Sequence, residues 1–175
     1  MDNIYIDKVL SGDVEAFSYF VKTYKNMAFN ISFAIVKDTQ YAEEVAQDAF
    51  MKAFKNLKSF KRTSKFKSWF YRIVVNESFL KLRGLKKSNL FISIEDQSDA
   101  ILEEHFEEVT ENHSQKIKEV LLLLDTKESL AIELFYLQEL NINKITDITG
   151  WTKANTKVIL HRARKSIRQI WKEIK

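Results

Sequence analysis

The stretch of residues 138–165, QELNINKITDITGWTKANTKVILHRARK, constrains the fold most, because it predicts two short helices joined by a tight turn. Its first part carries an apolar stripe at helical spacing, Ile142, Ile145 and Ile148. Gly150 ends this helix, since glycine adopts the left-handed backbone that a helix end requires, and Thr152 is a suitable N-cap for the next helix. The stretch therefore predicts a helix-turn-helix, whose second helix enters a DNA major groove in proteins of that kind.

The second predicted helix is apolar on one side and basic on the other. Its inner side carries Thr156, Ile159, Leu160 and Ala163. Its start and outer side carry the candidate DNA-binding residues Thr152, Lys153, Asn155, Lys157, His161, Arg162 and Arg164. Such side chains bind phosphate oxygens and read base edges. The alternative is a surface helical hairpin that is basic without binding DNA.

Glycine and proline are scarce, which favours an all-α protein of long helices. The 175 residues include no proline and three glycines, and 45% of them are hydrophobic, which suits one or two domains with buried cores. We expect all three glycines, Gly12, Gly84 and Gly150, at helix ends. Because there is no cysteine, disulfides, thiol catalysis and cysteine-based zinc sites are excluded.

Charge is segregated along the chain, although the net charge is only +4. Residues 51–92 contain 12 Lys and Arg against one acid, and residues 151–175 contain eight against one. Between them, residues 93–113 contain eight acids and no Lys or Arg. Two basic modules that flank an acidic spacer suggest two contacts on one nucleic acid.

The ends of the chain and its apolar runs give an expectation for location. No apolar run approaches the roughly 18 residues of a membrane span. The first residues, MDNIYIDKVL, lack the basic-then-apolar order of a secretory signal. We therefore expect a cytoplasmic protein without direct membrane insertion.

Two amphipathic helices are predicted in the first third of the chain. The first follows an N-cap at Asp13 and ends near Lys37, and the second is capped by Asp38. The apolar stripe of the second consists of Ala42, Val45, Ala46, Ala49, Phe50, Ala53, Phe54 and Leu57. Its outer face holds Glu43, Glu44, Gln47, Asp48, Met51, Lys52 and Lys55. Without further information, such a face is read as merely solvated.

A basic and aromatic loop, residues 59–67, precedes a third predicted helix that is capped by Ser64 and ended by Gly84. The expected core stripe of this helix is Phe66, Trp69, Phe70, Ile73, Val74 and Leu80. Three aromatic residues fall off that stripe and lie among cations, namely Phe60, Tyr71 and Phe79. Aromatic rings among cations suit unstacked, single-stranded bases better than a closed duplex.

Residues 89–113 are predicted to form an acidic linker, partly helical from Ala100 to Glu108, because they show neither a helical stripe nor strand alternation. His105 and His113 do not share a helical face, so we expect no metal site there. Beyond the linker, Asp125 and Glu128 form a capping-box-like start. Residues 114–175 are thus predicted to be a four-helix unit that ends in the helix-turn-helix.

Three motifs in order resemble the bacterial sigma factors of the extracytoplasmic-function (ECF) group of the sigma-70 family. YAEEVAQDAFMKAF resembles the helix that grips the polymerase clamp, FKSWFYRIVVNESFLKLR the −10 reader, and ITDITGWTKANTKVILHRARKSI the −35 reader. The resemblance covers nearly the whole chain. It implies two small helical domains, a region 2-like domain over 1–88 and a region 4-like domain over 114–175, joined by the acidic linker 89–113.

The resemblance also implies partners and site residues. The implied polymerase-binding residues are Glu44, Gln47, Asp48 and Met51. The implied −10 DNA-binding residues are Phe60, Lys61, Arg62, Lys65, Tyr71, Arg72, Asn76 and Arg83. The basic face that starts at Thr152 becomes the −35 reader. Core RNA polymerase and promoter DNA are the implied partners, together with an anti-sigma factor, whereas no small-molecule substrate, cofactor or metal is expected.

Three other functions remain as alternatives. A helix-turn-helix regulator that acts without polymerase would share the C-terminal part, but it leaves the basic and aromatic helices before it without a use. An enzyme is disfavoured because the sequence has no glycine-rich phosphate loop, nucleophile elbow or metal cluster. A single-stranded RNA-binding protein would use the first basic module and leave the helix-turn-helix idle.

Overall fold

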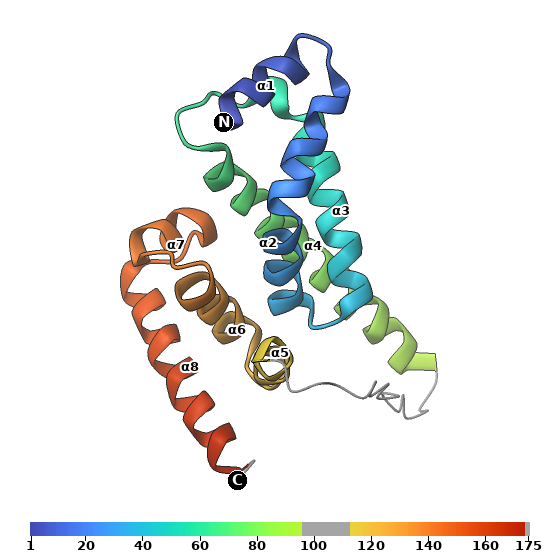
Figure 1. Cartoon of the computed structure of the whole chain (residues 1–175). Coiled ribbons are helices and arrows are strands. Elements are labelled where there is room, and N and C mark those ends of the chain that lie inside the picture. Colours follow the sequence, from blue (N-terminus) through green and yellow to red (C-terminus); the bar gives the residue numbers. More distant parts are fainter. Residues whose placement is uncertain (96–112, 174–175) are drawn as a thin grey trace.

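The computed structural model describes residues 1–95 and 113–173, in which every regular element is a helix (Figure 1). The α-helices are α1 Asp2–Leu10, α2 Ser18–Val36, α3 Thr39–Lys55, α4 Phe66–Glu95, α5 His113–Leu123, α6 Thr126–Ile132, α7 Ile142–Thr149 and α8 Lys153–Glu173. The all-α fold expected from the sequence is confirmed.

The N-terminal half is a bundle in which α2, α3 and α4 lie side by side while α1 packs at one end (Figure 1). Aromatic residues fill its centre. The rings of Phe20 and Phe66 lie 4.2 Å apart between centroids, and those of Phe50 and Phe70 lie 4.6 Å apart. These side chains are buried, so the apolar stripes of the three helices meet in one core.

Local capping explains where the first helices begin and end. The Asp38 carboxylate accepts a hydrogen bond from the Tyr41 backbone N–H at 2.8 Å, which satisfies a donor that the first turn of α3 leaves free. Asp13 caps a 3₁₀ turn, Val14–Phe17, in the same way before α2 starts. Lys37 ends α2 in the left-handed conformation, with φ of 59°. The predicted N-cap of α3 and the end of α2 near Lys37 are confirmed, whereas α2 begins only at Ser18, after the 3₁₀ turn, and α3 ends at Lys55, before Leu57.

Helix α4 differs from the prediction at both ends. The Lys65 carbonyl accepts the first backbone bonds, so Lys65, not Ser64, occupies the N-cap position. The helix then runs through Gly84 to Glu95. A glycine inside a helix weakens it by only about 0.5–1 kcal/mol relative to alanine, and regular flanking turns outweigh that cost here.

This correction leads to a stability prediction at Gly84. A Cβ atom added there meets no heavy atom within 4 Å, and the position is exposed. We expect Gly84→Ala to raise the free energy of unfolding by about 0.5–1 kcal/mol, because alanine loses less backbone entropy when the helix forms. Urea unfolding followed by circular dichroism measures this change. A decrease in stability would show that α4 ends at Gly84 in solution.

The C-terminal half contains α5, α6, α7 and α8, as expected for residues 114–175. A π-helical turn, Glu133–Leu137, directly continues α6 and is called the π turn below. Helix α7 ends at Gly150 with φ of 74°, and the Thr152 hydroxyl accepts a hydrogen bond from the Asn155 N–H at 3.1 Å. The helix-turn-helix is therefore formed with the predicted glycine turn and the predicted N-cap.

The two halves share part of one core. Helix α6 packs on α2, and α7 packs on α4. The apolar residues that the C-terminal half contributes to the N-terminal core are Leu130, Leu134, Ile145 and Ile148. In this structure the two halves are therefore in contact. Two domains joined by a linker, as predicted from the sequence, do not have to touch each other.

The predicted linker 89–113 overlaps both neighbouring helices. Helix α4 continues to Glu95, and α5 begins at His113. The predicted helical stretch from Ala100 to Glu108, with His105, lies outside the described residues. Helix α4 extends into the predicted linker because Gly84 does not adopt a helix-ending conformation.

Candidate nucleic-acid and polymerase interfaces

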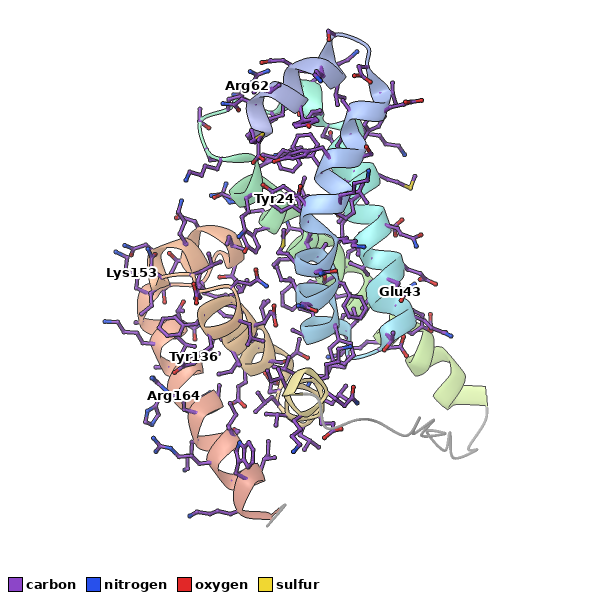
Figure 2. The ribbon with its side chains drawn as sticks, in the orientation of Figure 1. Tyr24, Glu43, Arg62, Tyr136, Lys153 and Arg164 are labelled. Carbon is purple, nitrogen blue, oxygen red and sulfur yellow. The ribbon has the colours of Figure 1, made fainter. Side chains whose placement is uncertain are left out.

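The outer face of α8 carries the −35 candidates as the sequence predicts. The side chains of Lys153, Asn155, Lys157, His161, Arg162 and Arg164 are all exposed. The opposite face is buried by Thr156, Ile159, Leu160 and Ala163. Figure 2 shows Lys153 and Arg164 projecting from α8 away from the rest of the molecule. The helix thus presents a continuous basic surface on a rigidly packed support.

The loop before α4 presents cations around a half-buried ring. Phe60 stacks on Trp69 with centroids 4.9 Å apart, so one face of its ring is anchored. Arg62 adopts the left-handed conformation, with φ of 57°, and its guanidinium Nη2 lies 2.5 Å from the Asp7 carboxylate on α1. Lys61 and Lys65 are exposed. The loop is therefore positioned by α1 and by Trp69, while Lys61 and Lys65 face solvent.

The remaining −10 candidates lie on α4 and fall into two groups. Asn76 and Arg83 are exposed, as predicted. Tyr71 is not, because only 2% of it is accessible and its hydroxyl donates to the Gln138 Oε1 at 2.9 Å. Arg72 is exposed, yet its Nε donates to the Asp147 carbonyl of α7 at 2.8 Å. The C-terminal half thus engages two residues that we assigned to −10 DNA.

The placement of aromatic residues on α4 corrects the predicted stripe. Phe79, expected to be available for bases, is partly buried against the core, whereas Leu80, expected in the core, is 55% exposed. The predicted apolar stripe assumed that α4 packs against other helices on one side only. Because α7 covers a second side of α4, the buried arc is wider and includes Tyr71 and Val75.

Burial changes the acid–base properties of two side chains between the halves. Burial, and secondly the negative charge of Glu133, raise the pKa of the Tyr71 hydroxyl well above its usual range. Burial also raises the pKa of the Glu133 carboxyl, although the hydrogen bond from Gln138 acts in the opposite direction. Both groups are therefore held in a medium that disfavours their charged forms.

The outer face of α3 carries the polymerase candidates. Glu44, Gln47, Asp48 and Met51 are all exposed. Glu44 forms an ion pair with Lys81 of α4, so part of its charge is already compensated. In Figure 2, Glu43 marks this side of α3, and it lies on the opposite side of the molecule from Lys153 of α8. The polymerase candidates and the −35 candidates therefore face different directions.

An apolar groove beside this face was missed by the sequence analysis. It has a volume of about 380 Å³ and is open to solvent. Its lining residues are Val14, Glu15, Phe17, Ser18, Val21, Phe50, Met51 and Phe54. Phe54, which we predicted in the core, is 36% exposed. One sequence feature could have revealed the groove. The segment around Val14 and Val21 has more apolar residues than the predicted core stripes require.

The −10 and −35 candidates meet at a second hollow, of about 510 Å³, between α4, α6 and α8. Arg83 lines it from α4 and Arg162 from α8, together with Lys86 and Lys127. Asp125 and Glu128 lie in the same hollow and offset part of the positive charge. The structure therefore brings one residue of each predicted DNA-binding set to a common site.

Residues 1–95 and 113–173 contain no group of three or more His, Cys, Asp or Glu arranged to hold a metal ion. In the same residues, no helix combines the length and the apolar character that a membrane crossing needs.

Comparison with known proteins adds to this geometry. Residues 20–87 match sigma-70 region 2. The chain is 29% identical to the ECF RNA polymerase sigma factor SigW of Bacillus subtilis, covering 94% of this chain and 93% of that protein. It is 27% identical to the ECF RNA polymerase sigma-E factor of Haemophilus influenzae, covering 95% and 93%. Along nearly its whole length the chain is similar to ECF sigma factors of the sigma-70 family. The region 2 match spans α2, α3 and most of α4.

Two solved structures share the fold of this chain. CnrH in complex with the cytosolic domain of CnrY aligns over 98% of this chain and 97% of that chain, with a TM-score of 0.69 and 18% identity. Sigma factor RpoE in complex with the anti-sigma factor NepR, from Bartonella quintana, aligns over 89% and 96%, with a TM-score of 0.70 and 22% identity. Both alignments extend over the two halves of the molecule.

Proposed function

We propose that this chain binds core RNA polymerase and directs promoter-specific initiation of transcription by recognising −35 and −10 elements and helping to open the DNA. The observation that carries the proposal is the similarity to SigW along 94% of the chain, which includes both basic modules. The exposed basic face of α8 and the basic loop before α4 are chemically suited to duplex and to single-stranded DNA, respectively.

We assign the individual roles as follows. Helix α3 docks on the polymerase through Glu44, Gln47, Asp48 and Met51, and the neighbouring apolar groove accepts an apolar side chain of the polymerase. The loop before α4 and the outer side of α4 bind the −10 strand. The outer face of α8 reads the −35 element. The chain acts in the cytoplasm, where polymerase and promoter DNA are found, and it has no catalytic activity of its own.

We also propose that an anti-sigma factor regulates this protein. The support is the shared fold with two proteins solved as complexes, CnrH with CnrY and RpoE with NepR. An inhibitor that contacts both halves would keep the −10 residues of α4 away from DNA. This assignment is separate from the sigma function, which does not require an inhibitor.

Transcription with purified components tests the proposed function. The chain, core polymerase and promoter templates from the same bacterium should together give promoter-specific transcripts, and neither protein should do so alone. The main competing function is a helix-turn-helix regulator that acts without polymerase docking. Specific binding to duplex promoter in the absence of polymerase, with no transcripts when polymerase is added, would favour that regulator.

Base reading and phosphate binding on α8 should be separable by mutation. A recognition helix reads bases with its first turns, so we expect Asn155→Ala and Lys157→Ala to change the ranking of −35 sequence variants, at about 1–3 kcal/mol for a lost base contact. Arg162→Ala and Arg164→Ala should weaken all variants alike and lower the salt slope by about one each. Competition binding at several salt concentrations measures both effects. An unchanged ranking in the first two variants would place base reading elsewhere.

A further inference from the structure

The hollow between α4, α6 and α8, called the basic hollow below, collects four cationic side chains from three helices. They are Arg83 and Lys86 of α4, Lys127 of α6 and Arg162 of α8. All four are exposed, and within the described residues none of them forms an ion pair. Four like charges around one concavity repel one another, so a bound anion would lower the free energy of this arrangement.

The two acidic residues of the basic hollow interact with other groups of the protein. The Asp125 Oδ1 accepts a hydrogen bond from the Lys127 backbone N–H at 2.9 Å, as the N-cap of α6. Burial lowers the pKa of the Lys37 ammonium at the end of α2, whereas the charges of Asp125 and Glu128 act in the opposite direction. Both carboxylates therefore lie close enough to Lys37 to stabilise its positive charge, and that ammonium offsets their repulsion of an anion.

The basic hollow also has an apolar wall. Phe79 and Leu82 of α4 line it, together with Ile159 of α8. Ile159 is buried, and Phe79 and Leu82 pack against the N-terminal core, so the wall is supported from behind. An apolar surface beside several cations suits a ligand that has a flat apolar part as well as negative charge.

The size and the chemistry of the basic hollow indicate the class of ligand. Its volume of about 510 Å³ lies within the range of roughly 300–1,000 Å³ that is usual for small-molecule sites. Four cations from three helices suit several linked phosphate groups better than one carboxylate. A nucleobase has the flat face that packs on an aromatic ring, and the carboxylates of Asp125 and Glu128 can accept hydrogen bonds from ribose hydroxyls or base amino groups. A nucleotide with two or three phosphates combines these features.

We propose that the basic hollow binds a nucleoside diphosphate or triphosphate, with the phosphates on its four cations and the base on Phe79. Lys86 and Lys127 distinguish this site from the DNA-binding surfaces, since neither belongs to the −10 or the −35 set. Arg83 and Arg162 belong to one set each, so a bound nucleotide should compete with DNA for both arginines. This competition rests on the proposed function, whereas nucleotide binding itself does not.

Calorimetric titration of the full chain, without polymerase or DNA, tests the site. We expect ATP and GTP each to bind one-to-one with a Kd below about 1 mM, the upper end of usual substrate levels. Lys86→Ala with Lys127→Ala should weaken nucleotide and inorganic pyrophosphate alike, by at least about tenfold, because each substitution removes a charge-assisted contact to phosphate. Phe79→Leu should weaken the nucleotides about 5- to 150-fold and leave pyrophosphate unchanged, because leucine keeps apolar packing but offers no ring for stacking.

A matched control removes the same charge elsewhere. Lys22→Ala with Lys25→Ala changes two exposed lysines of α2 and should leave both affinities unchanged. Circular dichroism shows whether each variant folds, and the Lys86/Lys127 variant decides the matter if Phe79→Leu does not fold. No nucleotide binding by the wild type, or equal weakening in the α2 control, would overturn the site. Pyrophosphate that binds as tightly as the nucleotides, with no effect of Phe79→Leu, would overturn the nucleotide assignment.

The transcription assay separates this inference from the proposed function. A wild type that supports promoter-specific transcription but binds no nucleotide when free removes the site and leaves the sigma function intact. A wild type that binds nucleotide as described, yet gives no transcripts with core polymerase, removes the sigma function and leaves the site. Where both hold, added ATP should weaken binding of a −35 duplex to the free chain, and it should do so less in the Lys86/Lys127 variant.

Discussion

Replacing Gln47 and Asp48 together with lysine should abolish promoter-specific transcription by preventing docking on core polymerase. Both side chains are exposed on the outer face of α3, away from the core, so the substitutions should not disturb folding. The charge on this face would select a basic polymerase surface, so two lysines there would bring like charges together. Such a contact costs several kcal/mol, and each 1.4 kcal/mol lowers affinity tenfold. We therefore expect at least about a hundredfold loss of affinity for core polymerase, measured by fluorescence anisotropy with labelled protein.

A variant with the same change in charge provides the control for this experiment. Gln169→Lys with Glu119→Lys replaces one glutamine and one acid at exposed positions of the C-terminal half. It should bind core polymerase normally. Met51→Ala adds a test of the apolar groove, because it shortens a groove wall without changing charge. Unchanged affinity in the Gln47/Asp48 variant would mean that the outer face of α3 is only a solvated surface.

The sequence was sufficient where a feature depends on neighbouring residues. Asp38, Thr152 and Gly150 act within one helical turn, and their capping roles are found in the structure as predicted. The exposed basic face of α8 follows from its apolar stripe in the same way. Helix ends and helix faces are local properties, so periodicity and capping chemistry are enough to predict them.

The sequence was insufficient to predict the environment of a residue where that environment depends on distant parts of the chain. Tyr71 was predicted to be exposed among cations, but it is buried, and its hydroxyl donates to Gln138, 67 residues later in the chain. A helical stripe indicates that one side is buried without indicating that a second helix covers another side. Gly84 was misread because glycine is tolerated inside a long helix at a small cost. The π turn at Glu133, which positions Gln138, has no sequence signature that we recognised.

The loop before α4 and the start of α4 should be needed for opening the −10 element. Opening loses base stacking, and a base stacked on an aromatic ring recovers about 1–3 kcal/mol. Phe60 has one face packed on Trp69, so the loop holds its ring in place. Asn76 lies one helical turn beyond Arg72 and is exposed, so its amide can bind a base edge. We expect Phe60→Ala, Arg62→Ala and Asn76→Ala each to reduce the open complex about 5- to 150-fold.

The structure supplies a matched control for each of the two polar substitutions. Asp7→Ala removes the ion pair with Arg62 but leaves the cation, so it should open promoters normally if Arg62 acts on DNA rather than by bracing the loop. Asn26→Ala replaces an exposed asparagine on α2 and controls for Asn76→Ala. Permanganate reactivity of −10 thymines measures opening, and filter binding measures polymerase and −35 contact, which should stay intact. A template mismatched at −10 should restore part of the activity, because the strands are then already apart. Normal thymine reactivity in all three variants would make residues 59–67 a structural loop and would move the opening function elsewhere on the chain.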